Sequence, residues 1–165
     1  MYAYVGGNPM SYIDPMGLYT EVIGWTGVGM GSSSFGHISV IINGTSYSFG
    51  PGGLNIQAAA DYLALNTKFR DGKGIILNLS SQQEAAFADY LKNKSGSYSA
   101  TGNNCGGPVQ GGLTSVGAFS GGISTFPNDV MSAIGASSSA IGQTYYRTNP
   151  ATASPASPWG HIGSP

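Results

Sequence analysis

The sequence predicts a single α+β domain in which a small antiparallel sheet packs against helices. Residues 37–50, HISVIINGTSYSFG, predict a β-hairpin, because two strand-like runs flank an Asn-Gly pair. Residues 80–83, SSQQ, form a capping box ahead of a stripe of apolar residues at helical spacing. The chain has 165 residues, of which 41% are apolar, and this is enough to bury one core.

The first elements are a strand over residues 19–25, a Gly/Ser loop over 26–36 and the hairpin. The two-residue turn sets the hairpin register, which is counted outward from Asn43 and Gly44. The expected pairs are Ile42–Thr45, Val40–Tyr47, Ile38–Phe49 and His37–Gly50. Alternation puts Ile38, Val40, Ile42, Tyr47 and Phe49 on the core face, and His37, Ser39, Ile41, Ser46 and Ser48 on a more polar face. His37 is therefore expected at a strand end, with Ser48 near it.

The elements after the hairpin are predicted from shorter patterns. The Pro-Gly-Gly at residues 51–53 ends the strand, residues 56–65 read as a short helix, and residues 75–79 read as a buried strand. The capping box starts a helix that carries Phe87, Tyr90 and Leu91 on one stripe and ends near Gly96. Weaker helical patterns cover residues 109–116 and 129–134. Residues 148–165 are rich in proline and are expected to form a disordered or loosely attached tail.

Composition excludes several classes of function. Six Lys and Arg oppose seven Asp and Glu, so the chain lacks the basic patch that a nucleic-acid-binding protein needs. Glycine, serine, asparagine and proline interrupt every apolar run, which leaves no block long enough to span a membrane. Residues 1–18 have neither the basic head nor the apolar middle of a signal peptide. One cysteine and two histidines make no recognisable metal site, and no phosphate-binding loop is present, so neither a metal nor a cofactor is expected.

Cys105 is the only cysteine and the strongest candidate for a nucleophile. Pro108 follows closely, and because proline favours the first turn of a helix, Cys105 is expected at or just ahead of a helix start. The partial positive charge there lowers the pKa of a thiol, and a nearby histidine would complete a thiolate–imidazolium pair. The alternative is a buried cysteine that acts as a small hydrophobic residue. Spacing alone leaves both possibilities open.

The first eighteen residues, MYAYVGGNPMSYIDPMGL, consist mainly of turn formers and tyrosines. Their pattern, YxYxxxNPxxxxDPxGL, resembles the closing segment of the RHS/YD-repeat core, which caps large bacterial toxin shells. The resemblance implies cleavage after Leu18, at the motif formed by Asp14, Pro15, Gly17 and Leu18, and release of a C-terminal toxin. The chain then divides into the end of the RHS core (1–18), a toxin domain (19–147) and the proline-rich tail (148–165).

Two further stretches resemble the PPPDE family of cysteine peptidases. Residues 36–54, GHISVIINGTSYSFGPGGL, are similar to its histidine motif, and residues 101–113, TGNNCGGPVQGGL, to its cysteine motif. The more distant lecithin retinol acyltransferase-like and permuted NlpC-type families share this order of histidine before cysteine. All have a circularly permuted papain-like fold, so the resemblance implies that fold, with His37 as base and Cys105 as nucleophile. The chain departs from the family pattern directly after the cysteine, where Gly106, Gly107 and Pro108 stand in place of polar and aromatic residues.

The residue that orients the histidine stays open among four candidates. Ser48 and Ser46 lie on the face of His37, and Asn103 and Asn104 adjoin the cysteine. His161 offers the opposite order, cysteine before histidine, but it lies in SPWGHIGSP, where no strand pattern surrounds it.

These resemblances imply a secreted antibacterial toxin, the C-terminal domain of an RHS effector, that acts as a papain-like thiol hydrolase on peptide, isopeptide or amide bonds. Delivery into a target cell by type VI secretion or a similar route is expected. The expected partners are the upstream RHS shell and a cognate immunity protein. The alternative is a non-catalytic toxin module that binds its target, with Cys105 buried as a structural residue.

Overall fold

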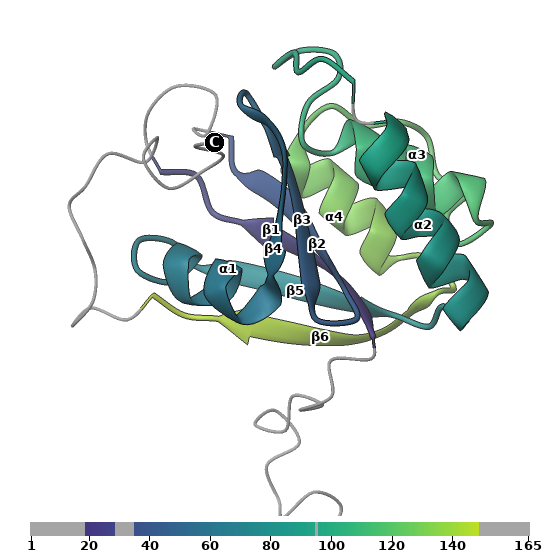
Figure 1. Cartoon of the computed structure of the whole chain (residues 1–165), viewed down its shortest axis with the longest axis horizontal. Coiled ribbons are helices and arrows are strands. Elements are labelled where there is room, and N and C mark those ends of the chain that lie inside the picture. The colour runs from purple at the N-terminus through teal and green to yellow at the C-terminus, as the bar shows by residue number, and fades with distance from the viewer. Residues whose placement is uncertain (1–18, 29–34, 95, 149–165) are drawn as a thin grey trace, which may run out of the picture.

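The computed structural model describes residues 19–28, 35–94 and 96–148 as an α+β fold (Figure 1). An antiparallel six-stranded sheet has the strand order β4-β3-β2-β1-β5-β6. The strands are β1 (Thr20–Trp25), β2 (His37–Ile42), β3 (Thr45–Gly50), β4 (Gly53–Ala58), β5 (Gly72–Leu77) and β6 (Ala140–Tyr146), and the helices are α1 (Ala59–Asn66), α2 (Ser81–Lys94), α3 (Gly107–Ser115) and α4 (Pro127–Gly135). The expectation of an antiparallel sheet packed against helices is confirmed.

Helices cover both faces of the sheet, α1 on one side and α2, α3 and α4 on the other (Figure 1). The larger core lies under α2–α4 and contains Val22, Ile38, Val40, Ile42, Tyr47, Ile75, Leu77, Phe87, Val109, Leu113, Val130 and Ile134. The smaller core lies under α1 and contains Ile23, Trp25, Ile41, Ala59 and Tyr62. The face of the hairpin that was expected to be more polar is therefore also buried, because α1 packs over it.

The predicted hairpin is present, with its turn at the expected residues. Asn43 and Gly44 have φ angles of 48° and 76°, which a type I′ turn requires. The ladder between β2 and β3 joins Ile42 to Thr45, Ile41 to Ser46, Val40 to Tyr47 and Ser39 to Ser48. It ends there, so the two outermost expected pairs, Ile38–Phe49 and His37–Gly50, are not part of it. The register is confirmed, and the length of the ladder was overestimated.

The capping box is also confirmed. The Ser80 hydroxyl accepts the Gln83 backbone N–H at 3.3 Å, and the Gln83 side chain accepts the Ser80 N–H at 2.9 Å. This exchange starts α2, and the weaker helical patterns further along the chain correspond to α3 and α4.

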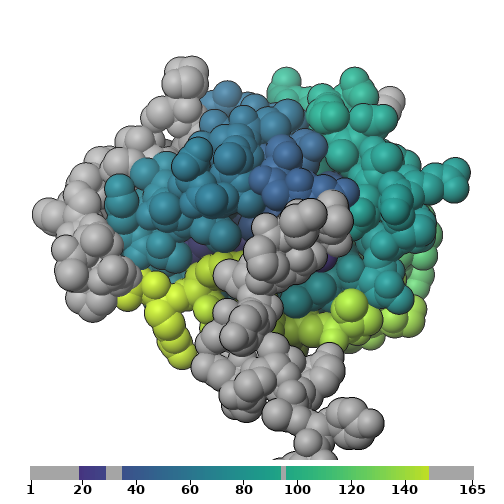
Figure 2. Space-filling model, turned by 60° about the horizontal axis from the view of Figure 1, so that its bottom comes forward, coloured from purple at the N-terminus to yellow at the C-terminus, as the bar shows by residue number. Residues whose placement is uncertain are grey.

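Two predictions after the hairpin need correction. Residues 56–58 belong to β4 rather than to a helix, because the chain after the second hairpin turn pairs with β3 and places Ile56 opposite Tyr47. Strand β5 begins at Gly72, three residues before the expected start. Strand β6 was not predicted, and it pairs with β5 at the edge of the sheet. Figure 2 shows β6 at the molecular surface along that edge.

Several predicted features lie outside the described residues. These are the RHS-like segment with its cleavage motif, Asp14, Pro15, Gly17 and Leu18, the proline-rich tail beyond Thr148, and His161. Among the helices that the structure describes, none has the length and apolar character needed to cross a membrane.

Gly44→Ala is expected to lower the free energy of unfolding by about 1–2 kcal/mol, because a residue with a Cβ resists the left-handed backbone. The added methyl group would meet no atom within 4 Å, so the loss would come from the backbone alone. Gly50→Ala is the control, because its methyl group is equally free and Gly50 has no positive φ. Urea denaturation of both variants measures the difference, and equal stabilities would contradict the turn assignment.

Candidate active site

Cys105 lies two residues before α3, at the end of the sheet where β2 begins. Its side chain is buried. The backbone N–H groups of Ile38, Cys105 and Gly106 favour the charged form of the sulfur. In this hairpin the Ile38 N–H is directed toward β3, and it is free for the sulfur because the ladder ends one pair earlier. The interruption of the ladder therefore leaves this N–H available to the thiol.

His37 is the first residue of β2 and is also buried. Its Nε2 lies 2.8 Å from the Ser48 hydroxyl oxygen, and the Tyr62 hydroxyl donates to the same oxygen at 3.4 Å. Gly36, with φ 91°, leads the chain into this position, and a Cβ there would lie 2.7 Å from the Trp25 carbonyl oxygen. Ser48 thus holds Nε2, and no described residue forms a hydrogen bond with Nδ1.

Of the candidates for an orienting residue, Ser48 is the one that contacts His37. Ser46 instead donates to the Gln57 carbonyl oxygen at 3.3 Å. Asn104 accepts the Gly106 N–H at 3.0 Å and donates to the Thr125 carbonyl oxygen at 2.6 Å. Asn103 donates to the Ser97 carbonyl oxygen at 3.0 Å. The two asparagines therefore shape the loop that carries the cysteine, and neither orients the histidine.

Arg70, which no sequence motif indicates, is the third functional residue of this region and acts on the charge of His37. It is only 2% exposed, and its Nε donates to Asn66 Oδ1 at 2.9 Å. Its guanidinium carbon lies 5.2 Å from the centre of the Trp25 ring, and Trp25 is the partner of His37 in the β1–β2 register. Its Nη1 has no hydrogen-bond partner, and no carboxylate among the described residues pairs with it. A buried, unneutralised cation thus lies beside the histidine.

Burial controls the ionisation of both reactive groups. It lowers the pKa of His37 well below its ordinary value, and the charge of Arg70 lowers it further. Burial also raises the pKa of Cys105, and this outweighs the opposing effects of the backbone N–H groups and Arg70. The expectation that the helix start favours a thiolate is therefore wrong for this site. The resting pair is a neutral thiol and a neutral imidazole, and among the described residues no hydrogen bond joins the two side chains.

Cys105 lines a cavity of about 290 Å³ with mostly apolar walls. Its lining includes Phe35, Tyr98, Asn104, Phe126 and Pro127. The walls of this cavity favour an apolar group next to Cys105. No cluster of three or more potential metal-binding side chains occurs in the described part of the chain.

Arg70→Met is expected to move the pH dependence of Cys105 alkylation toward higher pH, because Arg70 favours the charged form of the sulfur. The pKa of Arg70 is about 10, so it is charged at neutral pH. Lys68→Met removes the same charge from an exposed position and should keep the wild-type profile. Iodoacetamide labelling across a pH series, followed by intact mass, measures the midpoint. An unchanged midpoint in folded Arg70→Met would contradict the coupling.

Comparisons of this chain with family models, with curated proteins and with solved structures find no match. No matching family model supports the RHS resemblance or the papain-like resemblance, so both stay predictions. The case for a function therefore depends on the chemistry of the residues at the end of the sheet.

Proposed function

We propose that this domain is a thiol hydrolase of circularly permuted papain-like architecture that cleaves peptide, isopeptide or amide bonds. The observation that carries the proposal is that Cys105 and His37 lie at the same end of the sheet, Cys105 in the core under α2–α4 and the His37 ring on the face that α1 covers. Cys105 precedes α3, the Ile38 N–H favours the charged form of its sulfur, and His37 directly precedes Ile38 with its ring next to Ser48. The histidine strand comes before the cysteine helix in the chain, which is the order of the permuted arrangement.

The reaction begins from a neutral pair. As the sulfur of Cys105 attacks the substrate carbonyl carbon, its proton passes to the imidazole of His37. The imidazolium then gives this proton to the leaving amine as the carbon–nitrogen bond breaks, which leaves a thioester on Cys105. Water attacks the thioester with His37 as base, and the products are a carboxylic acid and the regenerated thiol.

The negative oxygen of the tetrahedral intermediate needs a hydrogen-bond donor near the sulfur. The Gly106 N–H is already taken by Asn104, and the Gly107 N–H donates to the Asn104 carbonyl oxygen at 3.2 Å. The backbone N–H of Cys105 is therefore the donor that we assign to this oxygen. Asn104 contributes by holding the loop in the conformation that presents it.

We place this chemistry in a toxin released from an RHS shell. In this proposal cleavage after Leu18 frees the domain, type VI secretion or a similar route delivers it into a target cell, and an immunity protein protects the producer. The support is the RHS-like pattern of residues 1–18.

A second candidate function is a non-catalytic toxin module that binds its target. The observation in its favour is the burial of Cys105, which is 4% exposed and has a raised pKa. The two functions differ in thiol reactivity. A catalytic Cys105 reacts with iodoacetamide at neutral pH in a manner that depends on His37, whereas a structural cysteine is protected until the protein unfolds.

Cys105→Ala and His37→Ala are each expected to abolish toxicity, because one removes the nucleophile and the other the base. His161→Ala is the matched histidine control and should remain as toxic as the wild type. Growth of bacteria that express each full chain, in the cytoplasm or with an export signal, measures the effect, and circular dichroism checks that the variants fold. A folded Cys105→Ala that still kills would contradict the hydrolase and support the binding module.

Ser48→Ala is expected to reduce the rate of Cys105 alkylation at neutral pH at least severalfold, because the His37 ring loses the group that orients it. Ser46→Ala removes a buried hydroxyl from the same face of β3 without touching His37, and it should leave the rate unchanged. If the two variants reacted at the same rate, Ser48 would have no part in positioning the base.

A further inference from the structure

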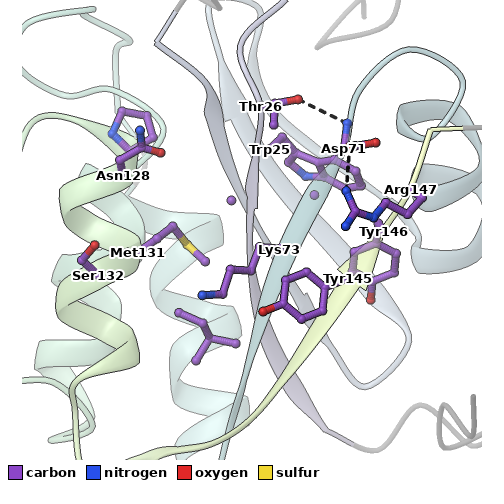
Figure 3. Close-up of a pocket in the computed structure, with 14 residues that line it drawn as sticks. Trp25, Thr26, Asp71, Lys73, Asn128, Met131, Ser132, Tyr145, Tyr146 and Arg147 are labelled. Carbon is purple, nitrogen blue, oxygen red and sulfur yellow. Dashed lines mark hydrogen bonds and ion pairs between the residues drawn. The ribbon is translucent and has the colours of Figure 1, made fainter. Parts of the chain in front are cut away.

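The cavity at Cys105 is one end of a longer groove. A second hollow shares Phe35, Gly36 and Phe126 with it. This hollow in turn shares Trp25, Thr26 and Asn128 with the cavity in Figure 3, whose volume is about 440 Å³. The three hollows follow one another over the first turn of α4, from β2 toward β6. We call this row of neighbouring hollows the cross-strand groove.

The strand registers align a row of residues beneath the groove. Ile38 of β2 lies opposite Gly24 of β1, Gly24 lies opposite Lys73 of β5, and Lys73 lies opposite Tyr145 of β6. Directly opposed residues of antiparallel strands share a face, so this row faces the side covered by α4. Gly24 has no side chain, and this leaves room for Met131 of α4, because a Cβ at this position would lie 2.6 Å from Met131 Cγ.

The two ends of the groove differ in chemistry. Near Cys105 the rim carries the aromatic side chains of Phe35 and Phe126, which are 65% and 54% exposed and whose ring centres lie 5.8 Å apart. At the far end Lys73 extends toward α4, between Met131 and Tyr145 (Figure 3). The groove is thus apolar next to the thiol and cationic beyond β1.

The charge of Lys73 is available to a ligand. Asp71, the nearby acid, is held by the Arg147 guanidinium and by the backbone N–H and hydroxyl of Thr148. Among the described residues Lys73 has no ion-pair partner. Asp129 lines the middle hollow and is negatively charged. An anionic group of a ligand therefore fits next to Lys73 and not in the middle hollow.

The spacing of the strands sets the distance between the two ends. Strands β2 and β5 are separated by β1 alone, which places their backbones about 10 Å apart, and the lysine side chain adds a few more ångströms. An extended polypeptide advances about 3.3 Å per residue, so this distance corresponds to about three to four residues.

We propose that the cross-strand groove binds an extended polypeptide, with an apolar side chain beside Cys105 and an acidic side chain three to four residues away against Lys73. This deepens the proposed function by naming its substrate class. A polypeptide fits better than a lipid chain because Thr26, Asn128 and Ser132 present polar groups along the path. An alkyl chain would bury those groups without partners, whereas a peptide backbone supplies donors and acceptors.

The test measures binding in the full chain with Cys105→Ala, so that no turnover is required. Fluorescent decapeptides of Gly and Ser carry one Phe and one Glu, separated by zero to six residues in either direction, and anisotropy gives their affinities. The tightest binding is expected when the Glu is three or four residues from the Phe. Replacing that Glu by Gln should weaken binding about two- to fivefold, as expected for a partly exposed ion pair.

Lys73→Glu provides the charge reversal. It should remove the preference for Glu and create one for a peptide with Lys at the same position, whereas Lys68→Glu, outside the groove, should bind like the parent. Affinities that ignore the spacing and the charge, or competition by dioctanoyl phosphatidylcholine at least as strong as by the best peptide, would overturn the proposal. If the peptides bind as expected but the wild type cleaves none of them, the hydrolase proposal fails and the groove proposal stands.

Discussion

The β2–β3 ladder ends at Ser39 and Ser48, and the arrangement of the reactive groups depends on that interruption. Continued for one more pair, the ladder would use the Ile38 N–H within the sheet. Because it stops, this N–H is available to the sulfur of Cys105, while the ring of His37 reaches Ser48 on the neighbouring strand. The turn that sets this register lies at the other end of the hairpin, and a slip of one residue would move His37 to the opposite face.

Burial is the second constraint, and it acts through α1. This helix covers the face of His37 and contributes Tyr62, whose ring lies 6.0 Å from that of Trp25, while Asn66 holds the nearby Arg70. Removing water makes both ionised forms costly, so the thiol and the imidazole remain neutral until a substrate carbonyl arrives. The pKa of His37 lies below its ordinary value, so the base stays neutral, and able to accept a proton, into the acidic range. A buried cation without a carboxylate partner lowers the stability of the folded protein, and its location next to reactive groups is typical of functional sites.

Local patterns predicted the parts of the fold that depend on neighbouring residues in the chain. Strand alternation and the Asn-Gly turn were sufficient to predict the hairpin register and the proximity of His37 to Ser48. Strand β6 was missed because an edge strand of alternating exposure carries little apolar signal, and it forms by pairing with β5. Arg70 was missed because Lys68 and Lys73 flank it, and a run of basic residues usually lies on a solvated surface. Its burial depends on α1 and β1, which the local sequence does not reveal.

The central claim is that the thiol of Cys105 forms a covalent bond to an acyl group, with His37 taking its proton. Intact mass spectrometry of the full chain, quenched at short times after mixing with an activated ester such as p-nitrophenyl acetate, tests this directly. The account predicts a transient adduct of acetyl mass on Cys105 that forms and decays in the wild type and forms far more slowly in His37→Ala. An adduct that never forms on the native protein, or that forms equally fast without His37, would contradict it.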